Sequence, residues 1–208
     1  MFTTKTKIAL IKGIVSKSSP IYVQYAVTKN CNLRCGMCDS SLSRQEEKEL
    51  TLQEIGKLAD ILEKLKVGII LLTGGEPFIR NDIAEIIRIF SKKKFTVRLQ
   101  TNGILANEDR IKAAYQAGMR EVTISLDSLE PEKQDAISGQ KNSFYKIIAA
   151  ISRFSQILPS KNNILGINTV VCRENLREIP RIIKFVTKIG FFSSLIPVHL
   201  AASDAEGF

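Results

Sequence analysis

Three of the four cysteines, Cys31, Cys35 and Cys38, lie within eight residues in the spacing C-x3-C-x2-C. Thiolate sulfur is a soft ligand that suits zinc or an iron–sulfur cluster. A structural zinc site closes with four protein ligands, and a [4Fe–4S] cluster is normally held by four thiolates. Three thiolates on such a cluster leave one iron open for a substrate or cofactor atom. The spacing therefore predicts a metal site with one open position.

Two residues could supply a fourth ligand, Cys172 and His199, but both lie more than 130 residues further along the chain. A cysteine late in an apolar strand is usually a small buried residue, and we expect that role for Cys172. We expect His199 to be a packed histidine. A small zinc-binding structural domain remains an alternative to the iron–sulfur site at this point.

Short β-branched or apolar runs alternate with amphipathic stretches along the whole chain. The runs predict strands at residues 21–29, 67–75, 95–103, 121–128, 164–172 and 193–201. Apolar residues at helical spacing predict helices over residues 51–66, 82–94, 108–118, 143–158 and 175–190. Strict alternation of strand and helix implies a parallel sheet with right-handed crossovers. The sheet could be a doubly wound open sheet or a barrel.

Four local signals place the ends of these helices. Thr51 and Glu54 make a capping box at the start of one helix, and Gly118 suits the end of another. Pro180 requires that the last helix either begins near Ile179 or kinks there. We expect Asn175 to be a helix N-cap.

Polar and glycine residues follow the predicted strands, and barrel-type architectures place their chemistry at those strand ends. In "GGEP", Gly74 and Gly75 allow close backbone approach, and Glu76 could accept from a ligand ammonium. The alternative is a tight strand-to-helix turn. "TNG" after the third strand is equally well read as a plain turn.

Strand alternation also places Ser125 and Asp127 on one face of the fourth strand. Inward polar groups need partners, which a ribose or an amino-acid head group would supply. The alternative is hydrogen bonding to a neighbouring loop. Asn168 is the inward polar candidate on the fifth strand.

The composition is that of an ordinary globular protein of 208 residues, with 44% apolar and 25% charged residues, which excludes disordered and fibrous classes. No apolar run is long enough for a membrane span. Residues 1–19 read as an amphipathic leading helix rather than a signal peptide, so we expect a cytoplasmic protein with reduced thiols. The net charge of +9 favours an acidic partner or a solvated basic surface, and no stretch suggests nucleic-acid binding.

Together these strings resemble the radical S-adenosylmethionine (SAM) superfamily. The resemblance is carried by "VTKNCNLRC", "LTGGEP", "LQTNG", "ISLDS" and "NTVV", and it extends over roughly residues 20–200. It is nearest to the branch that contains the molybdenum-cofactor cyclic-pterin enzyme and the peptide-modifying maturases.

The resemblance implies a single α/β domain over residues 1–208, built as a six-stranded parallel partial (β/α)6 barrel over residues 20–202 with a tail at 203–208. It implies that Cys31, Cys35 and Cys38 hold a [4Fe–4S] cluster with SAM on the fourth iron. It implies SAM contacts from residues at the strand ends: Met37, Gly74, Gly75, Glu76, Ser125, Asp127 and Asn168. The implied reaction is reductive cleavage of SAM to a 5′-deoxyadenosyl radical, which abstracts hydrogen from a small-molecule or peptide substrate.

Some features depart from the family pattern. Met37 stands where an aromatic residue is usual, and Ser138 stands where many relatives carry an arginine, so no SAM-carboxylate arginine is expected there. The chain ends at "AASDAEGF", just past the sixth strand, which suggests truncation before any auxiliary-cluster region. A non-catalytic iron–sulfur or SAM-binding module therefore remains the alternative. The basic charge would suit an acidic electron donor of the flavodoxin or ferredoxin kind.

Overall fold

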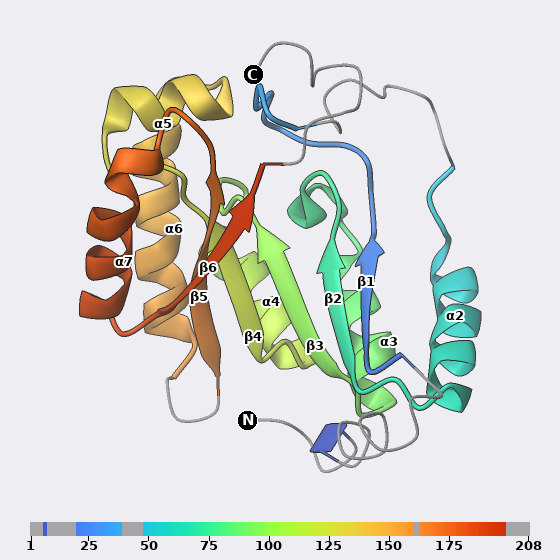
Figure 1. Cartoon of the computed structure of the whole chain (residues 1–208). Coiled ribbons are helices and arrows are strands. Elements are labelled where there is room, and N and C mark those ends of the chain that lie inside the picture. Colours follow the sequence, from blue (N-terminus) through green and yellow to red (C-terminus); the bar gives the residue numbers. More distant parts are fainter. Residues whose placement is uncertain (1–5, 8–19, 39–47, 160–162, 199–208) are drawn as a thin grey trace.

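The structure is a computed structural model that describes residues 6–7, 20–38, 48–159 and 163–198. One parallel sheet runs through it in the strand order β1-β2-β3-β4-β5-β6. Its strands are β1 (Tyr22–Ala26), β2 (Ile69–Thr73), β3 (Thr96–Thr101), β4 (Glu121–Ser125), β5 (Ile164–Val171) and β6 (Phe192–Pro197). Because each strand pairs with the next one in sequence, the sheet never reverses its order. It curls into a half-barrel (Figure 1), which confirms the α/β partial barrel and excludes the doubly wound alternative.

Helices cover the convex side of the curled sheet (Figure 1). They are α2 (Leu52–Lys64), α3 (Ile83–Lys92), α4 (Glu108–Ala117), α5 (Pro131–Ser138), α6 (Ser143–Ile157) and α7 (Ile179–Lys188). Two 3-10 turns, η2 (Pro77–Ile79) and η3 (Leu176–Glu178), follow β2 and β5. The sequence patterns predicted all of these α-helices except α5, which is short and only weakly amphipathic.

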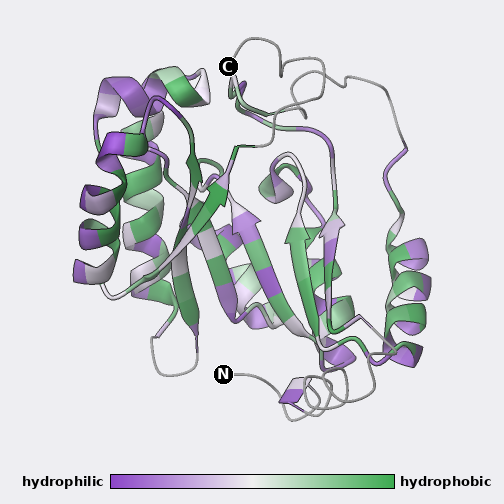
Figure 2. Ribbon diagram, viewed as in Figure 1, coloured by the Kyte–Doolittle hydropathy of each residue, from purple (hydrophilic) through white to green (hydrophobic). Residues whose placement is uncertain are grey.

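The core lies between the sheet and these helices. All five residues of β2 are buried, and Figure 2 shows this strand as hydrophobic along its length. On α3 the buried side chains are Ile83, Ile86, Ile87 and Phe90, the apolar face expected from the helical spacing. Phe90 packs edge-on against Phe95 with the ring centroids 5.9 Å apart. Because the helices cover the convex face of the sheet, the concave face is the one left for a ligand.

Three of the four predicted helix-end signals are confirmed. Thr51 and Glu54 form the reciprocal capping box of α2. Gly118 ends α4 in the left-handed region, with φ of 115°. The last helix begins at Ile179 with Pro180 in its first turn, where a missing N–H costs no helical hydrogen bond.

Asn175 stands at the N-cap position of η3, as predicted, but its side chain makes no capping bond. Its amide instead donates to the carbonyl oxygens of Asp127 and Val170, at 2.9 and 2.7 Å. Its oxygen accepts from the N–H of Cys172. A buried amide that bridges the ends of β4 and β5 satisfies more polar groups than a cap would.

Parts of the predicted organisation lie outside the described residues. They include most of the leading segment 1–19, the tail 203–208 and His199. Thr6, which is described, binds the base of the sheet through Gly68 O at 3.0 Å and the Thr96 hydroxyl at 2.8 Å. Among the described helices, none is long and apolar enough to cross a membrane.

Candidate functional site

The cysteine loop follows β1 and lies against the glycine turn that follows β2. Gly75 N donates to Thr28 O and Glu76 N donates to Asn30 O, each at 2.8 Å. This pairing extends the β1–β2 ladder beyond the sheet. A Cβ atom built on Gly74 would lie 2.2 Å from Thr28 O, and one on Gly75 would lie 2.2 Å from Asn30 O. Both glycines are therefore required by close backbone approach.

The three thiols occupy the far part of this loop. Cys31 and Cys35 are half-buried and Cys38 is exposed. The Cys31 Sγ accepts from Leu33 N at 3.4 Å and from the Asn102 amide at 3.9 Å. The N–H of Cys38 donates to the carbonyl of Cys35 at 3.2 Å, closing a turn between these two ligand candidates.

Burial governs the electrostatics of Cys31 and Cys35. Burial raises the pKa of Cys31, and burial raises the pKa of Cys35 to about 12, with further increases from Asp127 and the other two thiols. A bound metal cation deprotonates such thiols outright. Three soft sulfur donors on one loop suit a cluster of soft metal ions. Within the described residues, no three Cys, His, Asp or Glu side chains stand ready-arranged around a metal position.

Glu76 joins the turns after β2 and β3. It is completely buried, and its carboxylate accepts from Phe78 N at 2.9 Å, the Thr101 hydroxyl at 2.7 Å and Asn102 N at 2.7 Å. Burial raises the pKa of Glu76, and these three donors act in the opposite direction. The side-chain amide of Asn102 also contacts the Cys31 sulfur. By accepting from the backbone N–H of Asn102, Glu76 therefore holds in place a residue that contacts Cys31.

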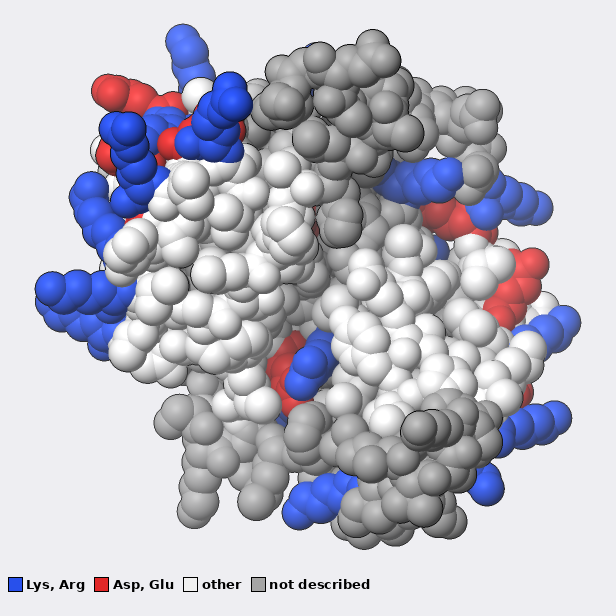
Figure 3. Space-filling model, in the orientation of Figure 1, with Lys and Arg blue, Asp and Glu red and all other residues white. Residues whose placement is uncertain are grey.

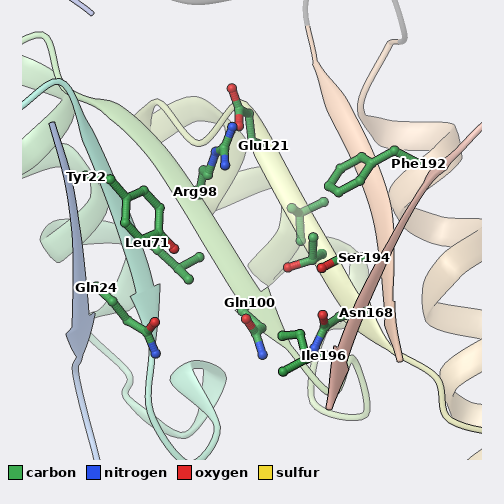
Figure 4. Close-up of a pocket in the computed structure, with 12 residues that line it drawn as sticks. Tyr22, Gln24, Leu71, Arg98, Gln100, Glu121, Asn168, Phe192, Ser194 and Ile196 are labelled. Atoms are coloured by element: carbon green, nitrogen blue, oxygen red, sulfur yellow. The ribbon is translucent and has the colours of Figure 1, made fainter. Parts of the chain in front are cut away.

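The ends of β4 and β5 hold the remaining predicted residues. Ser125 pairs with Asn168 in the strand register, and Asn168 points into the concave cavity (Figure 4). Because β4 ends at Ser125, strand alternation does not extend to Asp127. Asp127 is buried and accepts from Val170 N at 2.8 Å, and burial raises its pKa to about 6.

Sequence reasoning missed the supporting roles of two residues of α5. The Gln134 carbonyl oxygen accepts from the N–H groups of Asp127 and Ser128, at 2.8 and 2.9 Å. The Ser138 carbonyl accepts from Arg34 N at 3.1 Å and lies 3.9 Å from the Cys35 Sγ. The serine noted as a departure thus touches the cysteine loop. Because the sequence patterns did not predict α5, they gave no indication of these contacts.

Arg80 was also missed, although it joins the two ends of the cysteine segment. Its guanidinium donates to Val27 O at 3.1 Å, to Leu50 O at 3.2 Å and to the Asp82 carboxylate at 2.7 Å. Glu49 accepts from the Thr28 hydroxyl and pairs with Arg80 at 3.5 Å. We call Val27, Glu49, Leu50, Arg80 and Asp82 the neck of the cysteine loop.

The concave side of the barrel encloses a cavity of about 400 Å³. Figure 3 shows it as a central hollow walled mostly by uncharged side chains, with one red and one blue patch at its lower end. Its residues come from all six strands, as Figure 4 shows for Gln24, Leu71, Gln100, Asn168 and Ser194 among others. A volume of this size suits a small ligand.

Two kinds of comparison identify relatives by sequence. The family model described as the radical SAM superfamily matches residues 25–186. A GTP 3′,8-cyclase 1 of Mycobacterium tuberculosis is 39% identical over 140 residues, covering 62% of this chain and 38% of the relative. An AdoMet-dependent heme synthase of Methanosarcina barkeri is 29% identical over 178 residues, covering 85% and 50%. The chain thus spans half or less of the length of these two curated relatives.

Solved structures share the fold. SuiB of Streptococcus suis bound to S-adenosylmethionine superposes with a TM-score of 0.77 at 16% identity, covering 94% of this chain and 45% of SuiB. SuiB bound to its precursor peptide SuiA gives a TM-score of 0.75 at 17% identity, covering 93% and 43%. At this identity the likeness concerns the fold.

Proposed function

The chain belongs to the radical SAM superfamily, and from that premise we propose that it cleaves S-adenosylmethionine reductively at a [4Fe–4S] cluster. When bound, the cluster and SAM supply a 5′-deoxyadenosyl radical that abstracts hydrogen from a substrate. The observation that carries the proposal is the contact between the cysteine loop and the glycine turn, which brings the thiols and the "GGE" backbone to one edge of the barrel.

Cys31, Cys35 and Cys38 are the proposed ligands of the cluster. The two N–H groups directed at the Cys31 sulfur support this assignment, because hydrogen bonds to cluster sulfurs tune their electronics. The neck residues would keep the two ends of the loop together when the ligands bind.

The proposed SAM contacts are Met37, Gly74, Gly75, Glu76, Ser125, Asp127 and Asn168. Gly74 and Gly75 would present backbone groups to the methionine moiety. A carboxylate has about four acceptor sites, and Glu76 uses three, so its Oε2 atom keeps one for an ammonium group. Ser125 and Asn168 would reach a ribose or carboxylate from adjacent strands, and Asp127 would support them from its bond to Val170. Met37 would pack near adenine.

We propose a small molecule or a peptide as the substrate. Relatives named for GTP cyclisation and heme synthesis suggest a small molecule, and the peptide bound to SuiB suggests a peptide. We also propose that an acidic electron donor reduces the protein, since the net charge is +9.

The experiment is anaerobic reconstitution of the full chain, followed by addition of SAM and a strong reductant. The proposal predicts 5′-deoxyadenosine and methionine in equal amounts, and none from a Cys31→Ala variant. A protein that binds cluster and SAM yet releases no deoxyadenosine would instead be the non-catalytic module.

A further inference from the structure

The cavity has a floor built at the amino-terminal ends of the strands, away from the cysteine loop. Arg98 and Glu121 are register partners on β3 and β4, and Tyr22 and Phe192 are the first residues of β1 and β6. Figure 4 shows Arg98 and Glu121 side by side at this end, while Gln24, Gln100 and Asn168 lie toward the other. We call Tyr22, Arg98, Glu121 and Phe192 the cavity floor.

The floor carries one positive and one negative charge that neutralise each other. Arg98 Nε and Glu121 Oε2 form an ion pair, in which the Glu121 side chain is 4% exposed and the Arg98 side chain 35% exposed. The second carboxylate oxygen of Glu121 is buried and has no hydrogen-bond partner among the described residues. A buried acceptor without a partner is costly, so this oxygen would be stabilised by a donor on a bound group. The exposed part of Arg98 is a donor beside it.

The walls above the floor are uncharged and combine apolar side chains (Leu71, Val122 and Ile196) with polar ones. Gln24, Gln100 and Asn168 offer amides, and Thr123 and Ser194 offer hydroxyls, so donors and acceptors are both present. Arg98 and Glu121 are the only charged residues among the described side chains that line the cavity. A ligand group with a net charge would lose its hydration here without meeting a counter-charge. A neutral group that has both an N–H and a carbonyl oxygen meets a partner for each.

We propose that the cavity floor is a specificity site for an uncharged carboxamide-type group of the substrate, with its N–H on Glu121 and its carbonyl on Arg98. This inference rests on the proposed function, because it treats the cavity as the substrate site. Ser125 is four residue steps beyond Glu121 on β4, a rise of about 13 Å. The floor therefore lies about that far from the strand ends, where the cysteine loop lies.

The test uses three probes with the same ring and different charge: benzamide, benzoate and benzamidine. Their binding to the full chain, reconstituted and with SAM, is measured by saturation-transfer NMR. The wild type is expected to bind benzamide about tenfold more tightly than either ion. Glu121→Gln leaves Arg98 unpaired and shifts the preference about tenfold toward benzoate. Arg98→Gln leaves Glu121 unpaired and shifts it by a similar factor toward benzamidine.

Two further proteins keep the test decisive. The double variant Arg98→Gln/Glu121→Gln restores neutrality and is expected to return the preference to benzamide, even where a single variant folds poorly. The matched control removes the exposed Arg88–Glu85 pair on α3 with Arg88→Gln/Glu85→Gln, and the preference stays as in the wild type. A wild type without preference for benzamide, or variants that do not follow the sign of the remaining charge, overturns the proposal. Deoxyadenosine formation, assayed in the same samples, separately reports on the proposed function.

Discussion

Gly75 donates its backbone N–H to the carbonyl oxygen of Thr28 at 2.8 Å, so the turn after β2 and the start of the cysteine loop share one hydrogen-bonded ladder. The loop that carries the proposed ligands is therefore held by the sheet itself. Its position depends on glycine, because the partner backbone occupies the space where a side chain would begin.

Gly75→Ala tests this close approach. Its Cβ would lie 2.2 Å from Asn30 O, so the loop must move away and lose the two bonds to the turn. We expect the free energy of unfolding to fall by about 2 kcal/mol or more, measured by denaturant unfolding. Gly56→Ala is the matched control, since its Cβ meets nothing within 4 Å on α2, and it should stabilise the protein by about 0.5–1 kcal/mol. Equal stability of Gly75→Ala and wild type would contradict the account.

Arg80→Gln tests the neck of the cysteine loop. The variant loses the donors that join Val27 O to Leu50 O, so the ends of the loop separate more readily. We expect a chelator to remove iron from the reconstituted protein several-fold faster than from wild type. Arg88→Gln, which removes an exposed guanidinium from α3, should leave the rate unchanged. If both variants lose iron at the wild-type rate, the neck does not position the ligands.

Glu178 gives the protein a pH-dependent stability. Burial alone would raise its pKa, but Lys133 at 2.6 Å, the Ser128 hydroxyl at 2.9 Å and Leu129 N at 3.1 Å outweigh it and hold the pKa below the usual value. Because the folded pKa is the lower one, the stabilisation is complete above the unfolded pKa of about 4.3 and is lost as pH falls through the folded pKa.

Glu178→Gln should therefore be less stable than wild type by about 1–3 kcal/mol at pH 7, since hydrogen bonds to a charged group are lost. Unfolding curves at several pH values should show the difference shrinking below about pH 4. A difference that stays constant from pH 7 to pH 3 would mean that the carboxylate charge contributes nothing.

Reduction by an acidic flavodoxin should depend on salt. Charges farther apart than about 10 Å are largely screened at 0.1 M ionic strength, so attraction to a chain of net charge +9 weakens as salt rises. We expect the second-order rate constant of cluster reduction to fall several-fold between 0.05 and 0.3 M salt, measured by stopped-flow bleaching. Dithionite, a small anion, should show a much weaker dependence. A salt-independent rate with flavodoxin would exclude charge attraction as the basis of that encounter.

Sequence patterns predicted the barrel well because they are local. Apolar runs and helical spacing within ten or fifteen residues located every strand and five of the six described α-helices. The α5 helix escaped because "PEKQDAIS" buries only Gln134 and Ser138, so no apolar stripe marks it. The same helix supplies two supports of the site, and both were missed with it.

Contacts between distant residues could not be predicted from such patterns. Arg98 and Glu121 are 23 positions apart, and only the strand register places them together in the cavity. Glu76 was expected to face a ligand, yet three donors from two turns surround it, because a buried carboxylate at a strand end must be satisfied first. The SAM contacts stay predictions of the family resemblance.

The most direct test of the central claim is the electron paramagnetic resonance spectrum of the reduced, reconstituted full chain with and without SAM. The account predicts a [4Fe–4S]⁺ signal that changes when SAM is added, because one iron is open. The signal should persist in Cys172→Ala and be lost with the iron in Cys35→Ala. A Cys35→Ala variant that keeps its iron, or a wild type that binds one zinc and no iron, would contradict it.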